Sequence, residues 1–209
     1  KVVDRGRGHG LYLNTAGVGI RPAHVDVRPA RIAAGDAVLV SGDLGRHGVA
    51  VMSRRAGLEF ETSIESDLAP LASAVSALVE AAVDLRCLRD LTRGGLGTAL
   101  AELALDARLD IEIDETRVAV LPDVRGACEL IGLDPLYVAN EGRMVVFVAE
   151  ADATRALEAL ARIPETAGAA RIGRVREPVS GPGRGTLRND FGRSRPLPLG
   201  SGLELPRIC

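Results

Sequence analysis

Aromatic side chains are almost absent from this sequence: Phe, Tyr and Trp make up 2% of its 209 residues, and there is no Trp. Hydrophobic residues nevertheless make up 46%, which is enough for a sizeable core. That core must therefore be packed mainly from Ala, Val and Leu. The length allows one large domain or two small ones.

The sequence also lacks a surplus of charge of either sign. It has 26 basic and 28 acidic residues and a net charge of −2. A surface for nucleic acid or for an anionic membrane would need a basic excess, so neither kind of partner is expected. No apolar run approaches the roughly 20 residues of a membrane-spanning helix.

Paired cysteines are missing as well. Cys87, Cys128 and Cys209 form no CxxC or CxxH pair and the three histidines are scattered, so we expect neither a zinc site nor a disulfide framework. Cys87 falls in a strand-like run and Cys128 in a helical one, and we expect both to be buried core thiols. This cysteine usage fits a reducing, cytoplasmic location.

Strand-like and helix-like stretches mostly alternate, which predicts an α/β (α+β) domain of two layers over residues 35–183. The expected strands are residues 38–40, 85–88, 111–113, 143–148, 170–175 and 185–188. The expected helices are residues 47–55, 68–83, 96–107, 122–130 and 151–161. The order of the strands in the sheet does not follow from this pattern.

Both ends of the chain differ from this middle part. Residues 1–13 hold two short apolar runs around three glycines, which is typical of a β-hairpin. Residues 22–35 are expected to form a linker with a turn at Ala34-Gly35-Asp36. From Pro196 onward, prolines and glycines predict an extended, mobile arm that could reach on the order of 45 Å.

This arm ends on Cys209, the last residue of the sequence. A thiol in that place is a nucleophile that can visit different sites. A prenylation signal needs its cysteine four residues from the end, so it is excluded. An accidental or structural cysteine, or an intermolecular disulfide in an oxidising compartment, stays open at this point.

One glycine-rich loop, Asp90-Leu91-Thr92-Arg93-Gly94-Gly95-Leu96-Gly97, joins an expected strand to an expected helix. Free N–H groups at a helix start favour anions, glycine lets a phosphate approach the backbone, and Arg93 could pair with it. The other interpretation is a tight turn in which Thr92 or Asp90 caps the helix. No Gly-Lys-Ser/Thr follows, so the loop is not a Walker loop.

A second candidate segment, Asn140-Glu141-Gly142, comes directly before the apolar strand 143–148. A carboxylate beside a glycine at the mouth of a strand is well placed to face a cleft. A turn with a solvated Glu141 is the commoner arrangement for a single glutamate.

The tail Leu205-Pro206-Arg207-Ile208-Cys209 resembles the terminus of the HypE family, the maturation proteins of nickel–iron hydrogenases. These proteins are built on the fold of aminoimidazole ribonucleotide synthetase, PurM. The resemblance covers essentially the whole chain, and the tail is its most specific motif. Further matching segments are residues 1–3, 14–17, 39–42, 88–95, 124–129 and 139–142.

The resemblance implies a PurM-like C-terminal α/β domain of two layers over residues 35–183. Residues 1–34 would be a remnant hairpin of the PurM-like N-terminal domain and a linker, and residues 184–209 an extended C-terminal arm carrying the modified cysteine. Family members have a further N-terminal region with acidic metal- and nucleotide-binding residues. We therefore expect the Mg²⁺ ligands outside this sequence, and the chain by itself to be inactive.

The implied activity is that of an ATP-dependent carbamoyl dehydratase. A carbamoyl group is loaded on the thiol of Cys209, ATP phosphorylates its oxygen, and loss of two N–H protons leaves a thiocyanate, the source of the cyanide ligands of the nickel–iron site. Glu141 matches the catalytic base and Lys1 a lysine of the same site. The residues implied on the ATP and phosphate side are Asp90, Thr92, Arg93, Gly94, Gly95 and Asn140.

Implied partners are a HypF-like carbamoyltransferase and the HypC–HypD complex, and the full-length protein is expected to be a homodimer. Two other functions stay open. The chain could be a non-catalytic carrier or docking module for the modified cysteine, or belong to another PurM-like ATP-dependent synthetase. The terminal cysteine argues against a small-molecule synthetase, which has no need of one.

Overall fold

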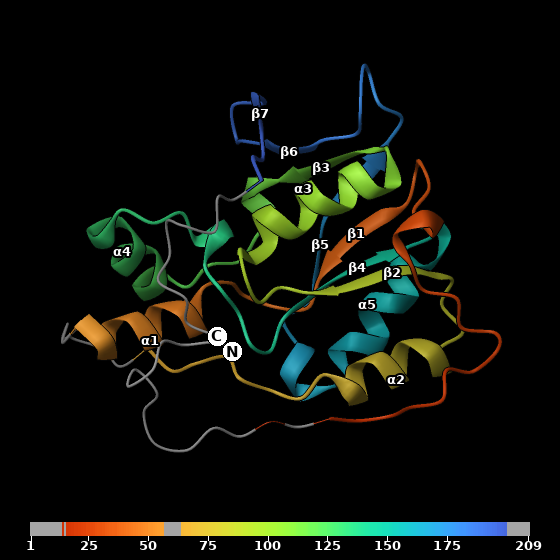
Figure 1. The fold of residues 1–209 in the computed structure, drawn as a ribbon, viewed down its shortest axis with the longest axis horizontal. Helices are drawn as coiled ribbons and strands as arrows, with labels where there is room; N and C mark the ends of the chain where they lie inside the picture. The colour runs from red at the N-terminus through yellow and green to blue at the C-terminus, as the bar shows by residue number, and fades with distance from the viewer. Residues whose placement is uncertain (1–13, 15, 57–63, 200–209) are drawn as a thin grey trace, which may run out of the picture.

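The structure is a computed structural model that describes residue 14 and residues 16–56 and 64–199 (Figure 1). Its centre is one seven-stranded mixed sheet in the order β2-β4-β1-β5-β3-β6-β7, in which only β3 and β6 are parallel neighbours. The strands are β1 Ala37–Val40, β2 Leu85–Asp90, β3 Asp110–Asp114, β4 Met144–Val148, β5 Ala170–Arg176, β6 Gly185–Arg188 and β7 Ser194–Pro196. All six strands expected from the sequence are confirmed; β7 is an addition.

Five α-helices accompany the sheet within the described residues. They are α1 Arg46–Ala56, α2 Ala72–Glu80, α3 Gly95–Ala107, α4 Pro122–Ile131 and α5 Ala153–Ala161. The expected turn at Gly35 is present, and this glycine has a φ of 93°, which a residue with a side chain rarely adopts. The expected hairpin over residues 1–13 and most of the tail lie outside the described residues.

Helix α2 is shorter than the periodicity predicts. It begins at Ala72 rather than Leu68, because Pro70 disfavours a helical conformation of the residue before it. Leu68, expected on the apolar face of this helix, is instead 73% exposed. The helix ends before Ala82, which has a φ of 51°.

Helices cover both faces of the central strands, so the domain has a helical layer on each side of the sheet rather than two layers in all (Figure 1). Helix α3 packs with Val38 and Phe147 on one face. Helices α2 and α5 pack with Leu39 and Val146 on the other. The unbroken apolar runs of β1 and β4, buried along their whole length, are typical of strands covered on both sides.

A smaller cluster lies beyond the end of β1. There α1 and α4 pack against each other through Val49, Val124 and Cys128, with Val138 between them. This cluster supports the loops at that end of the sheet, where the candidate site lies.

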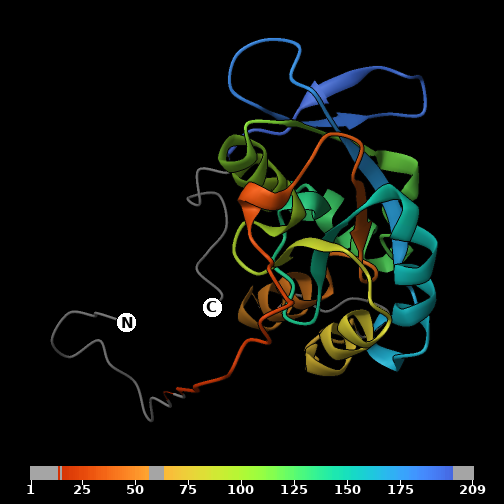
Figure 2. The same cartoon turned by 90° about the vertical axis from the view of Figure 1, so that its right-hand side faces the viewer.

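The sheet continues past residue 184, where the sequence suggested an arm. β6 pairs with β3, β7 pairs with β6, and the two form the hairpin farthest from α2 (Figure 2). Leu197 is buried in the main core and donates its backbone N–H to the carbonyl oxygen of Gly185. Strand β7 was not expected from the sequence, because prolines usually argue against a strand. It tolerates Pro196 because it is an edge strand. The division of the chain at residues 35 and 184 stays a prediction.

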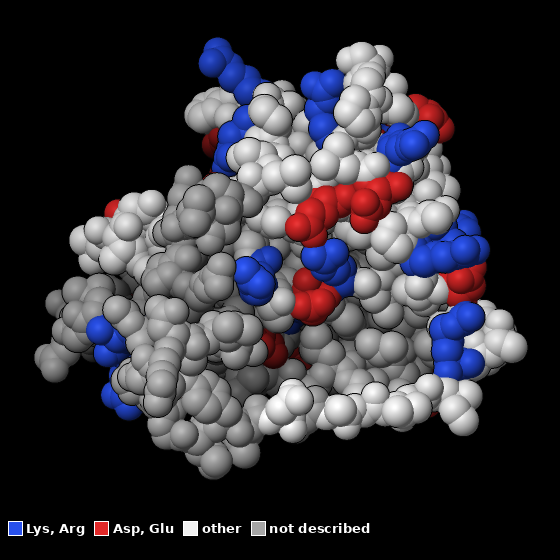
Figure 3. Space-filling view, viewed as in Figure 1, with Lys and Arg blue, Asp and Glu red and all other residues white. Residues whose placement is uncertain are grey.

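Charged side chains of both signs are interspersed over the described surface seen in Figure 3. On that face no large field of one sign forms, in keeping with the nearly balanced composition. Among residues 16–56 and 64–199, none of the helices has the length and apolar character that crossing a membrane requires.

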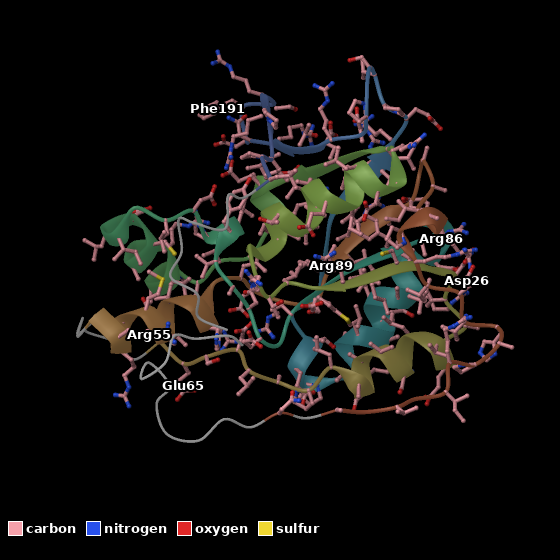
Figure 4. All side chains as sticks on the ribbon, viewed as in Figure 1. Asp26, Arg55, Glu65, Arg86, Arg89 and Phe191 are labelled. Atoms are coloured by element: carbon pink, nitrogen blue, oxygen red, sulfur yellow. The ribbon has the colours of Figure 1, made fainter. Side chains whose placement is uncertain are left out.

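Phe147, fully buried in β4, offers a test of the core. Phe147→Ala should lower the free energy of unfolding by about 3–5 kcal/mol, because it removes a large side chain from packed surroundings. The matched control is Phe191→Ala, at a residue of the β6–β7 turn that is 83% exposed (Figure 4). This substitution should lower the free energy of unfolding by no more than about 0.5 kcal/mol. Urea unfolding of both variants measures the difference, and equal losses would contradict this description of the core.

Candidate functional site

Three strand ends meet at one end of the sheet. β4 pairs antiparallel with both β1 and β2, so the last residues of β1 and β2 flank the start of β4: Val40 is opposite Val145 and Asp90 is opposite Met144. The loops at this end are therefore neighbours. We call them the strand-end loops; they comprise residues 41–45, 91–94 and 139–143.

Leu91 joins the two motifs that the sequence singled out. Its backbone N–H donates to the carbonyl oxygen of Arg143 at 3.0 Å, and its carbonyl oxygen accepts from the backbone N–H of Asn140 at 3.0 Å. The glycine-rich loop after β2 and the Asn140-Glu141-Gly142 segment before β4 thus lie side by side.

Asn140 is buried and holds the strand-end loops together. Its side-chain amide donates to the carbonyl oxygens of Leu91 and Val138 at 3.1 and 3.0 Å, and its side-chain oxygen accepts from the N–H of Gly45 at 2.8 Å. Both amide hydrogens are therefore used inside the protein. These three hydrogen bonds give Asn140 a structural role in the loops. A role of Asn140 on the phosphate side of the site stays a prediction.

Glu141 is half-buried between these loops. Its backbone N–H donates to the carboxylate of Asp67 at 3.3 Å. Its side-chain Oε1 is buried and has no hydrogen-bond partner in the described part of the chain. The solvated turn considered from the sequence does not describe this glutamate, because a buried carboxylate oxygen without a donor is costly and is unusual outside a site.

The turn that begins α3 differs from the capped turn considered from the sequence. The hydroxyl of Thr92 donates to the carboxylate of Asp90 at 2.6 Å, and neither side chain caps the helix. The capping position belongs to Gly94, whose φ of 76° favours glycine. The start of α3 therefore carries backbone N–H groups without a side-chain acceptor.

Close packing accounts for two glycines of this region. A Cβ on Gly95 would lie 2.5 Å from the carbonyl oxygen of Leu136, and one on Gly97 would lie 2.6 Å from the ring of Tyr137. Arg93 is exposed, at the mouth of the same turn. Contact of these residues with a phosphate stays a prediction.

Sequence reasoning missed three charged residues here: Asp43, Asp67 and Arg143. Arg143 was counted as the first residue of an apolar strand, yet its side chain is only 6% exposed and forms a 2.6 Å ion pair with Asp43. The sequence did contain a signal for the burial of Arg143, because an arginine between a glycine and the unbroken apolar run of β4 has little access to water.

The pKa of Asp43 lies below its ordinary value. Burial raises the pKa of this carboxyl, but the hydrogen bond and charge of Arg143, with the charge of Arg46, outweigh burial and lower it. Asp43 is therefore ionised in the folded protein at neutral pH and forms a charge pair with Arg143.

The two described cysteines are unreactive by position. Cys87 and Cys128 are buried free thiols, as expected, and burial raises the pKa of each to about 11. At neutral pH both stay protonated, and a protonated thiol is a poor nucleophile. Cys209 and Lys1 lie outside the described residues.

Acidic residues do not gather into a metal site in the described ranges, where no three His, Cys, Asp or Glu side chains are placed to hold an ion. The described residues therefore do not fit the expected Mg²⁺. That the Mg²⁺ ligands lie outside this sequence stays a prediction.

Comparison with known proteins now settles the family. Residues 33–181 match the family described as AIR synthase related protein, C-terminal domain. The chain belongs to this AIR synthase related family. The PurM-like fold expected from the motifs is thereby confirmed.

Within this family the chain is similar to HypE proteins, as its motifs predict. It is 46% identical to the carbamoyl dehydratase HypE of Cupriavidus necator over the whole chain, covering 59% of that protein. A crystal structure of the hydrogenase maturation protein HypE in complex with ATP is 39% identical over 88% of this chain and 55% of that one, with a TM-score of 0.83. The structure of a HypE–HypF complex matches with 38% identity, a TM-score of 0.76 and coverage of 83% and 55%.

The chain thus spans about three fifths of the length of the curated HypE proteins that it matches, 59% and 61% for the first two. The resemblance to HypE is confirmed by these similarities.

Thiol labelling at neutral pH tests the assignment of the cysteines. Iodoacetamide should label Cys209 in the native protein and reach Cys87 and Cys128 only after unfolding, because burial and a pKa of about 11 protect both. Peptide mapping identifies the labelled residue, and Cys209→Ser should abolish native labelling. Native labelling of Cys87 or Cys128 would contradict the structure.

The Asp43–Arg143 pair predicts a pH-dependent stability. A folded-state pKa below the ordinary 3.8 means that Asp43 stabilises the fold above pH 3.8 and loses this contribution as the pH falls through the lowered value. Asp43→Asn should therefore cost about 2 kcal/mol of unfolding free energy at pH 7, and progressively less below pH 3.8.

Urea unfolding of Asp43→Asn and the unchanged protein at pH 7 and in acid measures this dependence. Asp190→Asn, which alters an exposed carboxylate in the β6–β7 turn, serves as the control and should have little effect at either pH. A constant cost of Asp43→Asn across the range would show that the pair contributes no charge-dependent stability.

Proposed function

We propose that the protein containing this chain dehydrates a carbamoyl group carried on Cys209 to a thiocyanate, with ATP as the activating substrate and Glu141 as a proton acceptor. The observation that carries the proposal is the buried, unpartnered Oε1 of Glu141 beside the glycine-rich loop. The similarity to carbamoyl dehydratase HypE over the whole chain supports the same chemistry.

The reaction balances without a redox partner. The carbamoyl group on sulfur, S–C(=O)–NH₂, receives the γ-phosphoryl group of ATP on its oxygen and releases ADP. Two N–H protons pass to bases, the C–O bond breaks with loss of phosphate, and S–C≡N remains. The net change is removal of one water, coupled to ATP hydrolysis.

Glu141 suits the proton-acceptor role by geometry. Its Oε1 receives no hydrogen bond from the described residues, so a lone pair is free for a substrate N–H. Its backbone is fixed through Asp67 and by the bond of its neighbour Asn140 to Leu91. A fixed carboxylate in a partly dry setting needs little rearrangement at the moment of reaction. We assign Lys1 to the same site from the family resemblance.

The ATP side of the site is proposed at the turn before α3. Gly94 opens the helix without a side-chain cap, and exposed Arg93 could pair with a phosphate. Asp90, Thr92, Gly95 and Asn140 would shape this turn. A similar HypE has been solved with ATP, which supports nucleotide use by the full-length protein. We propose that Mg²⁺ accompanies the ATP and that its ligands lie outside this sequence, as the family resemblance implies.

Partners follow from the same similarity. A HypE–HypF complex is among the similar structures, so we propose a HypF-like carbamoyltransferase as the donor of the carbamoyl group. A HypC–HypD complex as acceptor of the cyanide and a homodimeric full-length protein complete the proposal. Both rest on the family resemblance.

Replacing Glu141 tests its role in the full-length protein. Glu141→Gln should still be carbamoylated on Cys209 by the carbamoyltransferase but convert the adduct to thiocyanate at least about a hundredfold more slowly, because an amide accepts a proton poorly. Intact-mass spectrometry after addition of ATP distinguishes the two forms.

Two further variants serve as controls for this experiment. Cys209→Ala should take up no carbamoyl group, whereas Glu129→Gln, an exposed position on α4, should behave as the unchanged protein. Normal conversion by Glu141→Gln would remove Glu141 from the mechanism.

A further inference from the structure

The guanidinium of Arg143 is almost fully buried beneath the strand-end loops and uses all three of its nitrogens. Its Nε donates to the carbonyl oxygen of Asp43 at 2.9 Å, and its Nη2 donates to the Asp43 carboxylate at 2.6 Å. Its Nη1 donates to the carbonyl oxygens of Gly142 at 2.9 Å and Glu165 at 3.3 Å. One side chain thus fixes the loop after β1, the loop before β4 and a turn after α5.

Two glycines leave the space that this arrangement needs. A Cβ on Gly42 would lie 2.7 Å from Nε of Arg143, and a Cβ on Gly142 would lie 2.0 Å from the carbonyl oxygen of Asp67. Any larger residue at either place would displace the arginine or the Asp67 segment. Gly42 therefore leaves room for the guanidinium, and Gly142 leaves room for the Asp67 segment.

Asp67 connects the guanidinium to Glu141. The Asp67 side chain has no exposed surface and its Oδ2 lies 4.0 Å from Nε of Arg143. Its Oδ1 accepts from the backbone N–H of Glu141. The guanidinium of Arg143 is the cation nearest to this buried carboxylate among the described ion pairs, so the two side chains place the segment before Glu141 together.

Stability alone does not explain such a cluster. Well-packed apolar residues of similar volume often stabilise a protein as well as a buried ion pair does. The buried guanidinium does, however, fix one geometry, because each of its nitrogens donates to an acceptor in a different part of the loops. Here the geometry that they fix is that of the residue carrying the unpartnered Oε1.

We propose that Arg143 and Asp67 are positioning residues for Glu141: the buried guanidinium clamps the strand-end loops and, through Asp67, holds the backbone of Glu141 so that its free carboxylate oxygen faces the carbamoyl group. This proposal rests on the function proposed above. It predicts an effect on the proton-removing step, since a displacement of about 1 Å can cost on the order of a hundredfold in rate.

The test uses Arg143→Lys in the full-length protein. Lysine keeps the charge but has no planar fork with which to reach the four acceptor oxygens of Asp43, Gly142 and Glu165. The rate at which carbamoylated Cys209 becomes thiocyanate should fall at least about tenfold, while KM for ATP changes less than about threefold. The control is Arg176→Lys, whose arginine pairs with Glu112 at the end of β5 opposite the strand-end loops; it should retain the full rate.

A double-mutant cycle separates positioning from general damage. If Arg143 acts through Glu141, Arg143→Lys should slow a Glu141→Gln protein no further, whereas an independent structural effect would multiply with it. Multiplied effects, or a full rate with Arg143→Lys while Glu141→Gln is slow, would overturn the positioning proposal. A full rate with Glu141→Gln would instead overturn the proposed function.

Asp67 variants keep the proposal testable if Arg143→Lys fails to fold. Asp67→Asn retains an oxygen for the Glu141 N–H and should lose less than about threefold in rate, whereas Asp67→Ala removes that oxygen and should lose at least about tenfold. The thermal unfolding of both is measured beside the rates. Equal rates for Asn and Ala at position 67 would contradict the proposal.

Discussion

The pairing of β4 with both β1 and β2 is the constraint on which the candidate site depends. Because β4 runs antiparallel to its two neighbours, segments separated by about fifty residues in sequence end beside the start of the same strand. The apolar side chains of β1 and β4 lock this register, since a shift by one residue would exchange their two buried faces. A core of small aliphatic residues thereby fixes a polar site at its end.

Most of the fold could be predicted because periodicity and turn chemistry act locally. The strand 143–148 and the helix 122–130 have strong local signals, an apolar run and an N-terminal proline, and both are present with nearly the expected bounds. The number of layers was harder to predict, because an apolar run such as 144–148 shows that a strand is buried without showing what covers it. That depends on where α2, α3 and α5 return in space.

The candidate site also has residues that the sequence indicated and residues that it did not. Glu141 and the glycine-rich loop stood out by residue type and position, and the structure places them side by side. Arg143 and Asp67 did not, because their roles depend on partners far away in sequence: Arg143 bonds to Asp43, 100 residues earlier, and Asp67 bonds to Glu141, 74 residues later. No local pattern reports such pairings. The family resemblance could indicate which residues react, but not which residues hold them.

The anchoring of Leu197 against β6 limits the distance that the Cys209 thiol can reach. The thiol is 12 residues beyond this fixed point in the sequence, so it cannot lie more than about 40 Å from Leu197. A reactant confined to such a volume has an effective concentration on the order of millimolar. The Cys209 thiol therefore meets any site on its own protein in an intramolecular encounter, which does not require affinity for a free small molecule.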